Sequence, residues 1–375
     1  MKLLVFQEQL ARSLTLASKF LPSRTTVIPS LQSFLLQATK DTITLTASDL
    51  EATITITLPG KIEKEGKILL PAKTTMSLLS TFSGEKISLE QEQNNLVMKG
   101  EKARVSLKTE AVQDYPQIES QGFEETFKMK RQTIEDVVKR IVFAVSRDQT
   151  RAVLTGILIA PQEEGTRFVA TDGFRLSLLT KKEEKMSGKD SIVVPARVLT
   201  AVVDAWQGQE SEAVEVSVAD KKNQIRFVLP QVSINARLIS GSFPDYRKII
   251  PTESQTTVTV SRDELLRAVK FASVIAREAA NTVRLSINDK EMVVSANAAQ
   301  TGTNQITLPI QKKGDPVDVA FNYRFLLDLL SAGSEEEVVF ETKGALAPGV
   351  FRFGKNQNFL HIVMPVRLQE SEEAK

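Results

Sequence analysis

One short pattern recurs six times along this sequence and limits the folds that the chain can adopt. Each copy is a strand-like segment followed directly by a segment whose apolar residues recur at helical spacing. The copies are residues 2–21, 66–82, 126–145, 191–206, 257–277 and 317–332, and their starts lie about 60 to 66 residues apart. Self-similarity at a fixed period indicates a repeated supersecondary unit, so we predict an array of six strand–helix units.

The third copy shows the pattern most clearly. Residues 126–129 alternate as a strand does, and one apolar stripe follows at Ile134, Val137, Val138, Ile141, Val142 and Val145. Thr133 and Asp136 are predicted to form a capping box at the start of this helix. Ser261 and Glu264 are predicted to form the same box in the fifth copy.

The even-numbered copies share a different feature. Pro71, Pro195 and Asn322 follow the strand and mark the start of the helix. A cation lies two residues after each of them, at Lys73, Arg197 and Arg324. Two alternating kinds of unit over six copies imply three domains, each built from one pair.

The predicted domains are residues 1–124, 125–250 and 251–375. Between the predicted helices of the first domain lie alternating segments at residues 33–38, 42–47, 52–58, 86–90, 96–99 and 103–108, which indicate half-buried strands. The predicted fold class is therefore α+β, with three similar domains of antiparallel sheet that carry two helices each.

Composition narrows the class of protein. The chain is 42% hydrophobic and 25% charged, which is typical of a soluble globular protein. It has no run of eighteen apolar residues and no basic-then-apolar leader, so we expect a cytoplasmic protein. The absence of Cys excludes disulfides, thiolate nucleophiles and Cys-based metal sites. The 48 basic and 46 acidic residues nearly cancel, but the cations favour the predicted helices and their ends.

No catalytic constellation stands out. The single histidine, His361, lies inside an alternating strand, where a structural role is more common than a catalytic one. The phosphate-binding loop, the HExxH and GxSxG motifs and the dinucleotide glycine fingerprint are all missing. Asp49, Asp172 and Asp245 recur near predicted turns, which favours turn capping, although composition alone leaves an acid-pair hydrolase open. We predict no catalytic residue, no metal and no cofactor.

Three segments resemble a known family. Residues 169–176 (VATDGFRL), 243–247 (FPDYR) and 364–368 (MPVRL) resemble the bacterial DNA polymerase III beta subunit, the sliding clamp, and the resemblance covers the whole chain. It implies a head-to-tail homodimeric ring of six similar domains, with helices around a hole for duplex DNA, and a non-catalytic processivity factor associated with the nucleoid. Its implied partners are the replicative polymerase, the clamp loader and other proteins with clamp-binding peptides. The alternative is a peptide-binding scaffold that binds no nucleic acid.

The resemblance also implies site residues. The expected DNA contacts are Arg24, Arg147 and Arg151, joined from their helix positions by Lys73 and Arg197. The expected peptide pocket comprises Leu154, Thr171, Gly173, Phe174, Arg175, Leu176, Pro244, Lys248, Ile249, Asn322, Phe325, Val363, Met364, Pro365, Val366, Arg367 and Leu368. The expected dimer interface sets Leu78, Phe82 and Val105 of one subunit against Val274 and Ile275 of the other. Phe174 occupies a position where many members carry His, which implies a shifted ligand preference.

Overall fold

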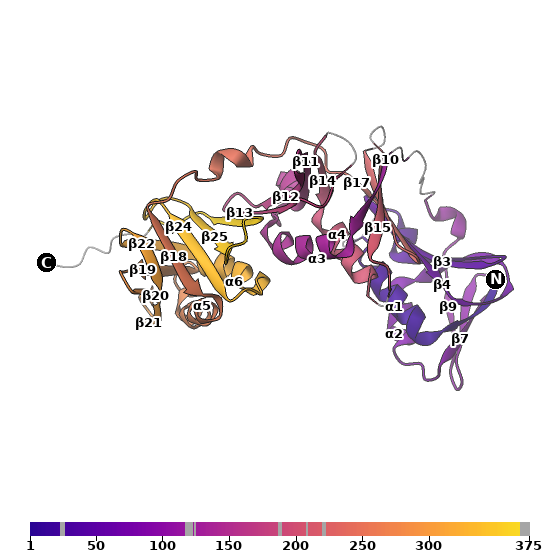
Figure 1. The fold of residues 1–375 in the computed structure, drawn as a ribbon. Coiled ribbons are helices and arrows are strands. Elements are labelled where there is room, and N and C mark those ends of the chain that lie inside the picture. Colours follow the sequence, from indigo (N-terminus) through magenta and orange to yellow (C-terminus); the bar gives the residue numbers. More distant parts are fainter. Residues whose placement is uncertain are drawn as a thin grey trace. The chain divides into compact units, whose positions relative to one another are not determined.

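The computed structural model describes residues 1–22, 27–116, 123, 125–186, 190–207, 209–219 and 223–367 (Figure 1). The chain divides into two compact units, and each unit combines segments that are distant in sequence. Unit 1 contains Met1–Ile134 and Arg197–Leu238, whereas unit 2 contains Glu135–Ala196 and Ile239–Lys375. The middle third of the chain thus contributes to both units.

All six predicted strand–helix units are present, and each helix begins at the residue after its strand ends. The pairs are β1 (Lys2–Phe6) with α1 (Gln7–Ser18), β6 (Gly66–Pro71) with α2 (Ala72–Leu79), β10 (Glu125–Lys130) with α3 (Arg131–Arg140), β14 (Ile192–Pro195) with α4 (Ala196–Ala205), β18 (Thr256–Ser261) with α5 (Arg262–Ala276), and β23 (Val317–Asn322) with α6 (Tyr323–Ala332). In α2, α4 and α6 the recurring cation is the second residue of the helix.

One predicted helix start is confirmed and the other is wrong. Ser261 is the N-cap of α5, and its side chain accepts a hydrogen bond from the backbone N–H of Glu264 at 3.4 Å. Thr133 is not a cap, because α3 already begins at Arg131. The backbone N–H of Arg131 donates to the carbonyl of Glu212, so the strand runs directly into the helix. Because the apolar stripe begins only at Ile134, the spacing of apolar residues does not reveal the polar first turn of α3.

Unit 1 contains two antiparallel sheets. The five-stranded sheet has the order β5 (Gly60–Lys64), β1, β7 (Lys86–Glu92), β8 (Asn95–Lys99), β9 (Arg104–Lys108). The eight-stranded sheet has the order β10, β15 (Ala213–Ala219), β16 (Gln224–Val228), β17 (Val232–Arg237), β4 (Ala52–Leu58), β3 (Thr42–Ser48), β2 (Ser33–Thr39), β6. The first and second thirds of the chain join where β17 pairs with β4, with Ile234 opposite Ile54.

Unit 2 repeats this arrangement. Its nine-stranded sheet has the order β14, β11 (Gly156–Gln162), β12 (Gly165–Thr171), β13 (Arg175–Lys181), β26 (Phe359–Val363), β25 (Gly349–Phe353), β24 (Glu337–Thr342), β18, β22 (Gln311–Gly314). Its four-stranded sheet has the order β21 (Gly302–Pro309), β20 (Glu291–Ala298), β19 (Thr282–Ile287), β23. The second and third thirds join where β13 pairs with β26, with Ser177 opposite His361.

The core of the last third is aromatic. The rings of Phe321, Phe340 and Phe351 pack with centroids 4.9 to 6.0 Å apart. Gly349 leaves room for two of these rings, because a Cβ at this position would lie 2.5 Å from the Phe321 ring and 2.9 Å from the Phe340 ring. Such rings cannot yield without moving their neighbours, since the core is close-packed.

We therefore predict that Gly349→Ala lowers the free energy of unfolding by roughly 1–3 kcal/mol through overpacking. Phe321→Leu shortens the ring that a new methyl group would meet, so the double variant should lose less than the sum of the two single losses. Urea unfolding followed by circular dichroism measures the three variants. Strict additivity would show that ring and methyl do not compete for the same space.

Candidate functional site

The turn between β12 and β13 is built by two side chains that bind its own backbone. The carboxylate of Asp172 accepts from the N–H groups of Phe174 and Arg175 at 2.9 and 3.0 Å. The hydroxyl of Thr171 donates to the Arg175 carbonyl at 2.6 Å and accepts from the N–H of Gly173 at 3.1 Å. Gly173 has φ = 94°, a conformation that L side chains rarely adopt. This turn leaves the ring of Phe174 61% exposed.

The chain after β26 returns to this turn. The predicted apolar run at the C-terminus ends as a strand at Val363, and residues 364–367 continue without regular structure. The N–H of Met364 donates to the Phe174 carbonyl at 2.9 Å, and the N–H of Val366 donates to the Ala320 carbonyl at 2.8 Å. Met364 is 40% exposed, so Phe174 and Met364 form an exposed apolar pair, the rim. Leu368 lies outside the described residues.

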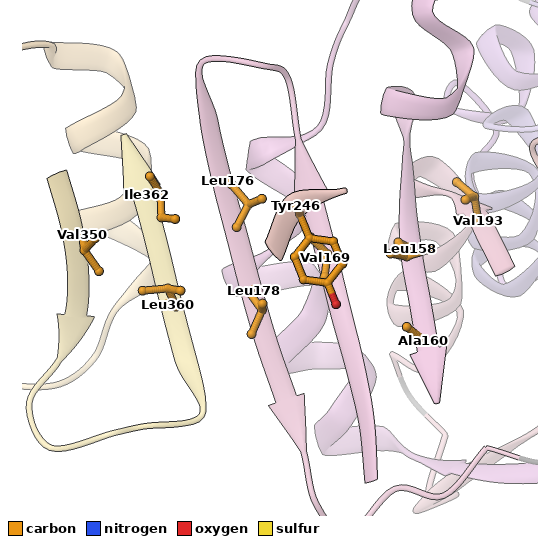
Figure 2. Close-up of a cluster of buried hydrophobic side chains, with 10 residues drawn as sticks. All are labelled: Leu158, Ala160, Val169, Leu176, Leu178, Val193, Tyr246, Val350, Leu360 and Ile362. Carbon is orange, nitrogen blue, oxygen red and sulfur yellow. The ribbon is translucent and has the colours of Figure 1, made fainter. Parts of the chain in front are cut away.

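An apolar face lies across the strands next to the rim. It crosses the β13–β26 pair, and the ring of Tyr246 lies over the strands (Figure 2). Its buried members are Leu158, Ala160, Val169, Leu176, Leu178, Val193, Tyr246, Val350, Leu360 and Ile362. Val153, Ile239, Phe243 and Ile250 pack against it while partly exposed. The ten side chains of this apolar face are therefore buried core, and only its four partly exposed neighbours offer hydrophobic contacts to solvent.

Arg175 connects three segments beneath the rim. Its side chain is 9% exposed, and the guanidinium donates to Asp172 at 3.1 Å, to Asp328 of α6 at 2.6 Å and to the Phe143 carbonyl at 2.5 Å. The ring of Phe325, also on α6, lies 4.5 Å from the guanidinium carbon. Because the charge is nearly buried and fully partnered, Arg175 fixes the turn against α6.

The structure brings most predicted pocket residues to this place. Seven of them lie at the paired ends of β12, β13 and β26 or directly next to these ends: Thr171, Gly173, Phe174, Arg175, Leu176, Val363 and Met364. Asn322 caps α6, and Phe325 packs on Arg175. Lys248 and Ile249 lie in a short 3-10 helix with Tyr246, Pro244 is exposed just before it, and Leu154 is buried before β11. Sequence reasoning missed Asp328, although a lone carboxylate inside the apolar stripe of α6 was a usable signal.

The predicted DNA-contacting cations differ in their exposure and in the groups that they contact. Arg24 lies outside the described residues, while Lys73 and Arg147 are exposed. Arg197 forms an ion pair with Asp49 at 2.8 Å. Arg151 is held by Asp148 at 3.5 Å and donates to the carbonyl of Asp172 at 3.1 Å. This last contact places a predicted DNA residue directly against the turn that carries Gly173 and Phe174.

The predicted dimer residues divide between exposed and half-buried positions. Val274 is 61% exposed on α5, and Phe271, one helical turn earlier, is also exposed. Ile275 is half-buried, as are Leu78, Phe82 and Val105. Phe271 was missed, although its spacing of three residues from Val274 places both on one face of a helix.

Unit 1 contains the same backbone arrangement with different side chains. Ser48 and Asp49 bind the β3–β4 turn as Thr171 and Asp172 bind the β12–β13 turn. Strand pairing gives six residues of the apolar face a counterpart in unit 1. The counterparts of Val169, Leu176 and Leu178 are Thr46, Thr53 and Thr55, and the counterparts of Leu360, Ile362 and Val350 are Ser233, Asn235 and Arg226. The apolar face of unit 2 thus corresponds to a polar face in unit 1.

The repeated units, the two sheets that continue from one third of the chain into the next, and the apolar face define a three-domain clamp architecture. Family models for the N-terminal, central and C-terminal domains of the DNA polymerase III beta subunit match residues 1–119, 128–245 and 247–367. The chain belongs to this family, as its motifs predicted.

Curated relatives and solved structures agree. The beta sliding clamps of Synechococcus elongatus and Bacillus subtilis are each 26% identical to this chain, cover 98% of it and are matched over their full length. The beta subunit structure from Thermotoga maritima matches with a TM-score of 0.91 at 25% identity, over 98% of this chain and 100% of that one. The Bartonella birtlesii sliding clamp bound to griselimycin matches with a TM-score of 0.92 at 26% identity, with the same coverage.

Two features are absent from the described part of the chain. No helix there is long and apolar enough to span a membrane. No group of three or more His, Asp or Glu side chains there could hold a metal ion.

The single histidine is buried in the junction between β13 and β26. His361 is 0% exposed, and its Nδ1 lies 2.7 Å from the hydroxyl of Ser177. Burial lowers the pKa of His361 to about 3, and the nearby charge of Arg175 acts in the same direction. The imidazole is therefore neutral at physiological pH and serves the packing of this junction.

This pKa predicts a pH dependence of stability. Below pH 6.5 the unfolded chain binds a proton at His361, whereas the folded chain does not until the pH nears 3, so acidification favours unfolding. The loss approaches about 1.4 kcal/mol per pH unit within that window. Urea unfolding between pH 5 and 7.5 should show this slope in the wild type and a flatter one in His361→Gln. Parallel slopes would place the titration elsewhere.

Proposed function

We propose that this protein is a sliding clamp that closes as a head-to-tail homodimer around duplex DNA and tethers partner proteins through a peptide pocket. It works as a processivity factor without catalysis of its own. Its three domains are residues 1–124, 125–250 and 251–375. The observation that carries the proposal is the exposed rim beside the apolar face, in a chain that matches clamps over its whole length.

Ring closure uses one apolar surface on each side of the subunit. The first surface contains Val274 and Ile275, with Phe271 beside them. It packs against Leu78, Phe82 and Val105 of the second subunit. Exposed apolar side chains on one helix face favour an interface over open solvent. The contact joins two different surfaces, so only a rotation that closes on itself yields a ring rather than a filament.

DNA contacts use charge without base readout. Five cations face the phosphates, which carry no sequence information directly. They are Arg24, Lys73, Arg147, Arg151 and Arg197. A ring held in this way is free to slide, because phosphates recur along the whole duplex. DNA therefore stays bound by topology rather than by adhesion.

The pocket binds a short extended peptide that contains Gln and Leu. The partly exposed neighbours of the apolar face receive the apolar side chains, and Phe174 and Met364 close over them as the rim. Flexible Met side chains suit a surface that accepts several partners. The griselimycin complex of the Bartonella birtlesii relative supports a ligand site in this family.

Topological retention predicts different fates on circular and linear DNA. A loaded ring should remain on a nicked circle and leave the same DNA within minutes of linearisation, because the ends release it. Gel filtration of labelled protein with each DNA measures retention. The control is Val274→Glu, which places a charge in the proposed interface and should be retained on neither. Two outcomes would favour the alternative, a peptide-binding scaffold that binds no nucleic acid. One is equal retention of the wild type on circular and linear DNA, and the other is a protein without DNA affinity.

The pocket predicts a selective loss of peptide affinity. Phe174→Ser removes an exposed aromatic contact and should weaken a fluorescent clamp-binding peptide roughly tenfold or more, since burying one such ring contributes about 1.5–3 kcal/mol. Deletion of residues 364–368 should abolish binding while the dimer persists. Leu50→Ser, in the matched turn of unit 1, is the control and should bind normally. Unchanged affinity after both pocket changes would move the pocket elsewhere.

A further inference from the structure

A small polar cavity adjoins the apolar face of unit 2. Its volume is about 140 Å³, and it lies between residues 251–254 and the strands β24 and β25. Val350 lines this cavity and is also a buried member of the apolar face. Ile250, one of the partly exposed neighbours of that face, comes directly before Pro251, which lines the cavity. The cavity is therefore continuous with the surface on which the proposed peptide lies.

One row of side chains leads from the cavity to the rim turn. Strand pairing sets Glu341 opposite Val350, and Val350 opposite Ile362 (Figure 2). Ile362 is in turn opposite Leu176, which pairs with Thr171 at the start of the turn. Neighbouring strands lie about 4.8 Å apart, so this row of five strands spans about 19 Å. An extended peptide covers that span with about six residues, which is within reach of a short partner segment.

The charged groups of the cavity are balanced in pairs. The Nε of Arg352 lies 3.4 Å from a carboxylate oxygen of Glu341, and the two side chains are 23% and 28% exposed. Glu253 pairs with Lys343 at 3.2 Å. In the part of the chain that the structure describes, Glu341 is the only ion-pair partner of Arg352, whose terminal nitrogens have no hydrogen-bond partner. The cavity thus offers guanidinium donors beside a carboxylate acceptor without a net charge.

This half-buried ion pair has no counterpart in unit 1. By the strand register that relates the two units, Ser217 stands in unit 1 where Glu341 stands in unit 2. Val228 likewise stands in place of Arg352. Desolvation makes a half-buried pair costly, and the same sheet arrangement forms in unit 1 without one. The two charges are therefore not a requirement of the fold, which favours a role in binding.

We propose that this cavity is a subsite of the peptide pocket that takes an uncharged carboxamide side chain from the flank of the partner peptide. The inference rests on the proposed tethering function and names a specificity determinant within it. The amide oxygen of such a side chain accepts from the Arg352 guanidinium, and its NH2 group donates to the Glu341 carboxylate. A charged side chain fits less well, since it meets a like charge beside each opposite charge.

The first test adds a flank to the peptide. A fluorescent clamp-binding peptide is extended by Gly-Gly-Asn, and separately by Gly-Gly-Ala, at one end or at the other. Fluorescence anisotropy should show that the Asn peptide binds about fivefold more tightly than the Ala peptide at one of the two ends, the gain expected of about one net hydrogen bond. Equal affinities of the Asn and Ala peptides at both ends overturn the subsite.

The second test changes the charge of the cavity. Glu341→Gln leaves Arg352 without its carboxylate, so a Gly-Gly-Asp peptide should bind roughly threefold more tightly than the Asn peptide. Arg352→Met leaves Glu341 without its cation, and a Gly-Gly-Lys peptide should then rank first. An ion pair that only stabilised the strands would change neither ranking. Asp318→Asn is the matched control, because it removes the carboxylate from Arg284 in the other sheet of unit 2, and it should keep the wild-type ranking.

The outcomes separate the subsite from the function on which it rests. A wild-type protein that does not bind the unextended peptide overturns the proposed tethering. Binding of the unextended peptide, with no difference among the extensions, overturns the subsite alone. An Asp or Lys peptide that ranks first in the wild type also overturns it, because the cavity then takes a charged group. Circular dichroism and gel filtration confirm the fold and the dimer, and either substitution carries the second test if the other does not fold.

Discussion

Strand pairing between successive thirds of the chain is the constraint on which the rest of the structure depends. The β4–β17 and β13–β26 pairs turn separate repeats into continuous sheets. Because side chains alternate along a strand, the register of each pair decides which residues share a face, and a slip by one residue would reverse every one of them. The pairing of Arg175 with Val363 thus sets the rim, the apolar face and the position of Met364 together.

The same backbone supports one apolar face and not two. The turns in units 1 and 2 are bound by equivalent Ser/Thr and Asp side chains, and the strand pairs that follow are in the same register. Only the side chains differ: Thr53 and Asn235 are opposite each other in unit 1, where Leu176 and Ile362 are opposite each other in unit 2. Polar side chains lose hydrogen bonds with water when an apolar ligand covers them, so the polar face of unit 1 does not favour such a ligand. Selectivity between the two faces therefore lies in side-chain polarity rather than in the fold.

Local periodicity predicted what is local in this structure. The six strand–helix units, the strands of the first domain and the Ser261 cap follow from spacing within a few residues. The Asp49 and Asp172 turn bonds were likewise anticipated from their recurrence at turns. The contacts of Arg175 with Phe143 and Asp328 join residues far apart in sequence, and no periodicity encodes them. The family motifs supplied the expected pocket residues but not the charged contacts of Arg175 beside them.

The Asp172 turn also links the two proposed functions of the chain. Its carboxylate binds Arg175 beneath the rim, and its carbonyl accepts from Arg151 of the predicted DNA-contacting segment. If the Arg151 guanidinium turned to a DNA phosphate, it would lose its hydrogen bond to this carbonyl. Where it stays, that hydrogen bond stabilises the Phe174 turn. Any difference in energy between these two arrangements must act equally in both directions, since coupling between binding sites is reciprocal. Within the proposed function, the contact between Arg151 and the Asp172 carbonyl is therefore a direct physical connection between the proposed DNA surface and the proposed peptide pocket.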